Sequence, residues 1–178
     1  MINVEELLTE LSGLTQQHIR AVQSFKELPQ ELLNRKPAAG GWNILECVEH
    51  LNRYGDFYIP EIERCIRNAK CRPSAVFKPG LLGNYFAKSM LPKERMNKMK
   101  TFKSMDPADS PLDLSVLDKF IHQQEQLLQL LEVSRQTDLT GVKTSISISK
   151  WIKLRLGDTL RVVVYHNLRH VAQAQKLG

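Results

Sequence analysis

Apolar residues recur every three or four positions in four long stretches of the chain, which is the spacing of one face of an α-helix. The pattern predicts helices over about residues 3–27, 43–69, 113–134 and 158–176. In the second stretch, Asn43 and Glu46 have the spacing of a capping box, in which each side chain accepts a hydrogen bond from the other residue's backbone amide. Pro60 lies inside the same stretch, and we expect it to kink or break the helix.

Segments rich in proline or glycine separate these stretches. Residues 29–41 are predicted to be a connector, and residues 71–111, which contain five prolines, a long irregular connection with room for a short helix over 80–91. A connection of that length fits a crossover that lets two successive helices run parallel. Residues 145–149 alternate with period two, which predicts a short extended segment or hairpin. The sequence therefore predicts an all-α fold: a single four-helix bundle domain over residues 1–178, with a long crossover between its second and third helices.

Three histidines are candidate metal ligands. His166 and His170 are four residues apart on the last predicted helix, so they lie on one helical face, and His50 is on the second helix. Three histidines from two helices would leave coordination positions open, as in catalytic rather than structural zinc sites. A pair of histidines at this spacing often binds nothing, however, and a histidine such as His50 is more often a hydrogen-bonded core residue. His18 and His122 are predicted to be surface or packing residues.

Amino-acid composition excludes few classes of protein. No apolar run approaches the ~18 residues of a membrane span, and the N-terminal residues have no features of a signal peptide, so we expect a cytoplasmic protein without a membrane segment. Three cysteines without a regular framework indicate reduced thiols. The net charge of +6 is compatible with acidic partners or nucleic acid, but many small proteins carry such a charge without binding either.

Two segments carry a resemblance to a known family. The stretch Gly41-Trp42-Asn43-Ile44-Leu45-Glu46-Cys47-Val48-Glu49-His50-Leu51 resembles the second-helix signature of the DinB-like (YfiT-like) superfamily of inferred metalloenzymes. The stretch Tyr165-His166-Asn167-Leu168-Arg169-His170-Val171-Ala172-Gln173 is similar to that family's last helix. The resemblance implies a four-helix bundle that binds one divalent metal ion, commonly zinc or nickel, through His50, His166 and His170. It also makes a homodimer plausible.

Two chemistries follow from an open metal position. A bound divalent ion can generate hydroxide from water near neutral pH, and it can also bind and deprotonate a thiol. The predicted function is therefore a metal-dependent enzyme acting on a small-molecule substrate, either a hydrolase or a thiol S-transferase. The resemblance favours the second chemistry at least as strongly, because similar members use low-molecular-weight thiols such as bacillithiol or mycothiol.

Candidate catalytic residues flank the three histidines. Glu46 lies one turn before His50 and could act as a general base, although the capping box is its more ordinary role. Arg169 and Gln173 could contact a substrate, and Arg169 could equally form a structural ion pair. Cys47 could be a fourth ligand or a nucleophile, but a cysteine at such a position is more often a small buried apolar residue. Tyr54 could orient a bound water molecule or simply pack.

The alternative prediction is a module that does not catalyse, either a metal-binding protein or a nucleic-acid or protein interaction module. Basic residues crowd the crossover among aromatic ones: Lys78, Lys88, Lys93, Arg95, Lys98, Lys100 and Lys103, with Phe77, Tyr85, Phe86 and Phe102. A solvated loop covering one end of the bundle explains this composition better, so nucleic-acid binding is not the expected function.

Overall fold

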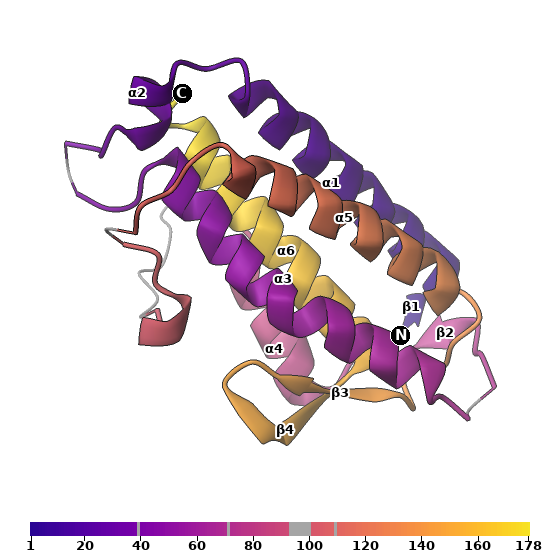
Figure 1. Ribbon diagram of the computed structural model, residues 1–178. Helices are drawn as coiled ribbons and strands as arrows, with labels where there is room; N and C mark the ends of the chain where they lie inside the picture. The colour runs from indigo at the N-terminus through magenta and orange to yellow at the C-terminus, as the bar shows by residue number, and fades with distance from the viewer. Residues whose placement is uncertain (39, 71, 93–100, 109) are drawn as a thin grey trace.

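The computed structural model describes residues 1–178 except residues 39, 71, 93–100 and 109 and the side chain of Lys150. The fold is mostly helical, with 63% of residues in helices and little strand. Four long helices lie side by side in Figure 1: α1 (Val4–Phe25), α3 (Ile44–Arg67), α5 (Ser115–Ser134) and α6 (Leu156–Gln175). Helices α5 and α6 each pack against both α1 and α3, so the four helices enclose a common core.

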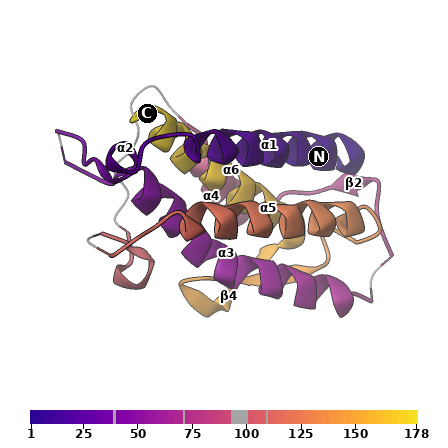
Figure 2. The same cartoon turned by 45° about the horizontal axis from the view of Figure 1, so that its top comes forward.

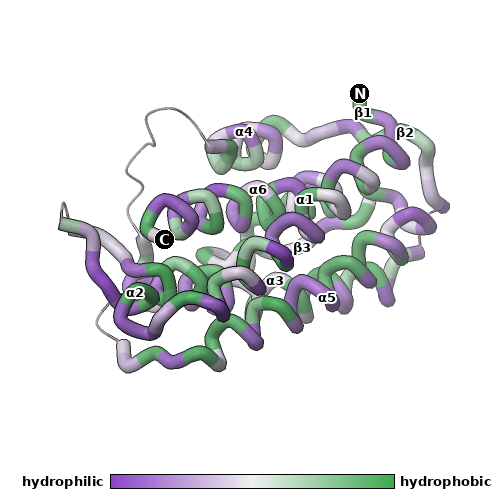
Figure 3. Tube along the Cα trace, turned by 90° about the horizontal axis from the view of Figure 1, so that it is seen from above, coloured by the Kyte–Doolittle hydropathy of each residue, from purple (hydrophilic) through white to green (hydrophobic). Residues whose placement is uncertain are grey.

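The directions of the four helices follow from their connections. Figure 1 shows α3 and α5 running in the same direction and α1 and α6 running in the opposite one. The end of α3 and the start of α5 therefore lie toward opposite ends of these helices. In Figure 2, α1, α5 and α3 are seen as successive rods with α6 behind them. Figure 3 shows hydrophobic positions recurring along each long helix, in keeping with the periodicity that predicts them.

Helix α3 begins where its sequence predicts. The side chain of Asn43 accepts a hydrogen bond from the amide of Glu46 at 2.8 Å, and the Glu46 carboxylate accepts one from the amide of Asn43 at 2.9 Å, which confirms the capping box. The helix runs through Pro60 without interruption, so the predicted break is wrong. Pro60 is exposed, so its ring displaces no core residue, while Tyr58 and Ile62 stay anchored in the core.

Shorter elements close the two ends of the molecule. Strand β1 (Ile2–Asn3) pairs antiparallel with β2 (Val76–Phe77), and β3 (Lys143–Ile146) forms a hairpin with β4 (Ser149–Arg155), which confirms the predicted extended segment. Helix α4 (Leu81–Met90) confirms the expected short helix, and a 3₁₀ turn follows at Lys103–Met105. Helix α2 (Gln30–Asn34) lies in the segment predicted to be a connector, and its buried residue Leu33 holds it against the core.

Helix α4 packs closely on α6. The amide of Gly80 donates a hydrogen bond of 2.7 Å to the buried carboxylate of Asp158, and Arg161 donates one of 3.0 Å to Asn84. At Gly83 the approach is closer still, because an added Cβ would be 2.5 Å from side-chain atoms of Asp158. Only glycine permits this contact without displacement of the helix.

The buried apolar residues form two clusters, one at each end of the helices. On α3, Leu51 belongs to one cluster and Tyr58 to the other, and on α6 the division falls between Tyr165 and Val171. All three candidate histidines lie on these two helices at or next to the boundary. The core is therefore interrupted by polar side chains at one level along the helices, which is where a functional site can form.

Candidate metal centre

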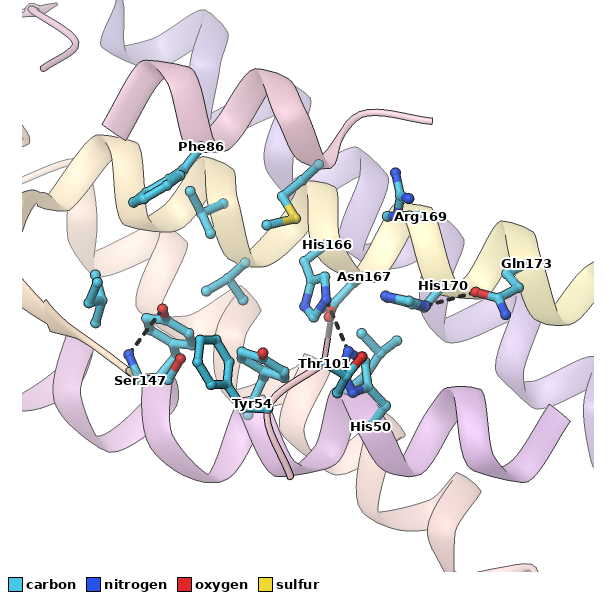
Figure 4. A pocket seen from close by; sticks show the side chains of 18 of the residues that line it. His50, Tyr54, Phe86, Thr101, Ser147, His166, Asn167, Arg169, His170 and Gln173 are labelled. Atoms are coloured by element: carbon cyan, nitrogen blue, oxygen red, sulfur yellow. Dashed lines mark hydrogen bonds between the residues drawn. The ribbon is translucent and has the colours of Figure 1, made fainter. Parts of the chain in front are cut away.

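The structure brings the three predicted histidines together. His50 on α3 faces His166 and His170 on α6. The ring centroids are 4.7 Å apart for His50 and His170, 4.8 Å for His166 and His170, and 5.0 Å for His50 and His166. The Nε2 atoms of His50 and His166 are 3.2 Å apart, and one nitrogen from each of the three rings lies within 4.8 Å of the others. Figure 4 shows the three side chains converging on one region between the helices. This group could hold a metal ion.

Two of the rings are oriented by hydrogen bonds on their outer nitrogens. Nδ1 of His50 lies 2.8 Å from the carbonyl oxygen of Met105, and Nδ1 of His170 lies 3.0 Å from Oε1 of Gln173. Because both partners are oxygens that only accept, each Nδ1 carries the proton and donates it. The lone pairs of the two Nε2 atoms are then free to act as ligands, which is the usual arrangement of metal-binding histidines.

Burial keeps the histidines neutral. It lowers the pKa of His50 to about 4 and that of His170 to about 3, and it lowers the pKa of His166 far below its ordinary value. Repulsion between the imidazoles also lowers the pKa of His166 and of His170. Metal ligation requires unprotonated imidazole, so at neutral pH all three side chains are in the form that binds a cation.

Aromatic side chains surround the histidines. The ring of Trp42 lies 4.5 Å from that of His50 and 5.6 Å from that of His170, and Tyr54 lies 4.7 Å from His166. The indole nitrogen of Trp42 donates a hydrogen bond of 3.2 Å to the carboxylate of Asp106. Two aromatic rings therefore pack directly against the three histidines.

Residues from the long connection complete the site. Arg53 donates a hydrogen bond of 2.7 Å to the carbonyl of Asp106, next to the Met105 carbonyl that accepts from His50. The sequence pattern did not reveal these contacts, because a backbone carbonyl has no side-chain signature. The sequence did not predict the hydrogen bond from Trp42 to Asp106 either, although Trp42 belongs to the segment that carries the family resemblance.

The predicted catalytic candidates lie in different places. Arg169 and Gln173 line the cavity next to the histidines, and Arg169 is 5% exposed. Glu46 is buried at the start of α3, where its carboxylate belongs to the capping box and forms an ion pair of 2.7 Å with Lys36. It does not line the described cavity, and its role as a general base stays a prediction.

Cys47 and the two remaining histidines lie outside the three-histidine group. Cys47 is fully buried in the apolar core, and burial, reinforced by the charge of Glu46, raises the pKa of its thiol to about 12. That environment is typical of a packing residue rather than a nucleophile. Both remaining histidines are predicted to be surface or packing residues. His18 is buried and is a packing residue, whereas His122 is exposed and is a surface residue.

A cavity of about 660 Å³ opens at the three histidines. Its described walls come from α3, α4, α5, α6, the β3–β4 hairpin, residues 41–42 and residues 101–102. Within this lining the charged residues are Arg169 and Lys176, and both are cationic. The cavity is large enough for a small organic molecule whose polar group reaches the histidines.

The basic crossover is only partly described. Lys93, Arg95, Lys98 and Lys100 lie outside the described residues, so the predicted basic stretch cannot be placed as a surface. Phe86 and Phe102, two of its aromatic residues, line the cavity. In the part of the chain that the structure describes, no helix is long and apolar enough to cross a membrane.

Fold and site together define a mostly helical protein with a buried three-histidine group that could hold a metal ion. The family model of the DinB superfamily matches residues 13–174, and the chain belongs to that superfamily. The matched range includes all three histidines, and the resemblance carried by their two segments is confirmed. Comparisons with curated proteins and with solved structures gave no match.

Proposed function

We propose that the protein is a metal-dependent enzyme in which His50, His166 and His170 hold one divalent ion, zinc or nickel. The observation that carries the proposal is the convergence of three neutral imidazoles from two helices, with two outer nitrogens already engaged. In the same proposal, the four long helices and the connection between α3 and α5 form the four-helix bundle with crossover that the superfamily resemblance implies.

The distance between two of the donor atoms fits the proposed ion. Two imidazole nitrogens bound to one tetrahedral zinc ion, each at ~2.0–2.1 Å, would be about 3.3 Å apart. The Nε2 atoms of His50 and His166 are 3.2 Å apart. Two imidazoles at this separation repel each other if both present lone pairs, and a shared cation removes that repulsion. Three nitrogen ligands suit zinc and nickel better than magnesium or calcium, which prefer oxygen.

A divalent ion bound there would supply an open position at which water or a low-molecular-weight thiol loses a proton. The chain's own residues supply the surroundings. Trp42 and Tyr54 pack against the histidine rings, Gln173 fixes the ring of His170, and Arg169 places a positive charge beside the cavity. That charge would stabilise an anionic nucleophile or a substrate carboxylate.

We propose a thiol S-transferase or a hydrolase acting on a small molecule, and both reaction classes stay open. The size of the cavity supports a small-molecule substrate over a macromolecule. Glu46 stays a candidate base on its sequence position alone. A cytoplasmic location and a homodimer are further proposals that rest on the sequence and on the resemblance.

Metal content tests the proposal directly. Protein purified without a metal-affinity tag is analysed for bound elements, together with His50→Ala, His170→Ala and the control His122→Ala, whose imidazole is exposed. We expect about one equivalent of zinc or nickel in the parent and the control, and a strong loss in the other two variants. Full metal content in both His50→Ala and His170→Ala would refute the three-histidine site.

Reaction class is tested on protein with established metal content. The loaded protein is incubated with an electrophile and either a low-molecular-weight thiol or water alone, and products are separated by mass spectrometry. Thiol adducts formed by the parent and by His122→Ala, but not by His166→Ala, would support S-transfer. Hydrolysis with the same dependence would support the alternative, and turnover that is equal in all three proteins would refute catalysis at this site.

A further inference from the structure

From the histidines, one part of the cavity extends along the helices toward Tyr58. On α3, Tyr54 and Tyr58 follow His50 at four-residue steps, and on the antiparallel α6, Val162 precedes His166 by one turn. All of these residues line the cavity. Eight residues of helix correspond to about 12 Å, so the wall runs about that far from His50 to Tyr58.

The walls of this extension are mainly apolar. They comprise Tyr58, Phe86, Met90, Ile146, Ile148, Leu154 and Val162, which we call the apolar arm. The arm is built from α3, α4, α6 and the β3–β4 hairpin, and Figure 4 shows Phe86 and Ser147 on the opposite side of the histidines from Gln173. The hydroxyl of Tyr58 accepts a hydrogen bond of 3.3 Å from the amide of Ser147, so it is already engaged within the protein.

Charge is distributed unevenly along the cavity. Arg169 lies between His166 and His170 on α6, Lys176 follows the C-terminal end of that helix, and the described lining contains no carboxylate. A charged group placed in the arm would lose its hydration without gaining a counter-charge. An uncharged apolar group would instead remove both its own surface and that of the arm from water.

We propose that the apolar arm binds the uncharged hydrocarbon or aromatic body of the substrate while its reacting group lies at the three histidines. The position of the reacting group rests on the proposed function. Binding of the apolar body of the substrate in the arm does not depend on that function. The substrate class is thus an apolar small molecule. Helix α4 serves this role directly, because it contributes Phe86 and Met90 to the arm.

Binding of a homologous series tests the arm. N-phenyl-1-naphthylamine, an uncharged fluorescent probe, is bound to metal-free protein and displaced by n-alkanethiols from butanethiol to octanethiol, and the titration is repeated on zinc-loaded protein. We expect affinity to rise about fourfold with each added methylene in both forms. An affinity independent of chain length would overturn the arm. A steep series in a protein that takes up no zinc would support the arm and refute the metal site.

Two matched pairs of variants locate the binding. Ile148 and Ile152 belong to the same hairpin and are 49% and 39% exposed, but only Ile148 is part of the described lining. Phe86 and the adjacent, exposed Tyr85 form a second pair of the same kind. We expect Ile148→Asp and Phe86→Ala to weaken octanethiol binding at least fivefold, and Ile152→Asp and Tyr85→Ala to leave it within twofold. Equal effects within both pairs would overturn the assignment.

Discussion

His18 provides the sharpest test of the energetics of the core. Its side chain is 1% exposed, and neither ring nitrogen has a hydrogen-bond partner among the described residues. Leaving a buried polar group without a partner costs about 1–3 kcal/mol. Replacement by leucine, an apolar residue of similar size, should therefore stabilise the protein by about that amount at pH 7.5, less any loss of packing.

The stabilisation produced by His18→Leu should grow as the pH falls. Burial lowers the pKa of folded His18 to about 4, whereas an unfolded histidine has a pKa of ~6.5. Between these values the unfolded chain binds a proton that the folded chain does not, so the wild type loses stability as the pH decreases through this window. The loss that His18 causes amounts to about 2 kcal/mol at pH 5 and is absent at pH 7.5. His18→Leu should escape it.

The measurement is urea unfolding followed by circular dichroism, on metal-free protein, at pH 7.5 and pH 5. The three site histidines also titrate, but they do so in both proteins, and their contribution cancels in the difference. His122→Leu is the control, because its side chain is exposed in the folded state. A His18→Leu difference that does not widen at pH 5 would refute the reasoning.

Two further predictions concern packing and ligand orientation. Gly83→Ala places a Cβ 2.5 Å from Asp158 and should lower stability by about 1–3 kcal/mol in thermal unfolding. Gly13→Ala, which meets no atom within 4 Å in α1, should instead raise it by up to ~1 kcal/mol, and equal effects would contradict the close approach of α4. Gln173→Leu removes the acceptor of His170 Nδ1 and should weaken zinc affinity by about 10–100-fold in chelator competition. An unchanged affinity would show that the bond does not orient the ligand.

Local patterns predicted the helices and the candidate ligands. The capping box at Asn43 depends on two side chains three residues apart, and His166 and His170 share a face because they are one turn apart. Both relations exist within a single helix, so the sequence displays them directly. The juxtaposition of His50 with that pair depends on how α3 packs against α6, and the family resemblance supplied it where spacing alone left it open.

Contacts between distant segments were not predictable in the same way. The pairing of Ile2 with Phe77 joins two-residue strands that are too short to show alternation. Helix α2 is a single short helix between proline and glycine, and its packing depends on one buried leucine, Leu33. Gly83 gives no sign in the sequence that Asp158 lies against it. In each case the determining interaction is tertiary, and the local sequence is compatible with several structures.

The long connection between α3 and α5 shows how such tertiary contacts affect the candidate site. Its length and prolines predict a crossover, and a crossover needs only to span the distance between α3 and α5. In the structure it also supplies the Met105 carbonyl that fixes the protonated nitrogen of His50, and Asp106 ties the same turn to Trp42 and Arg53. The orientation of one candidate ligand therefore depends on residues more than fifty positions away in the chain. A change in this turn would alter the candidate metal site without replacing any of its three histidines.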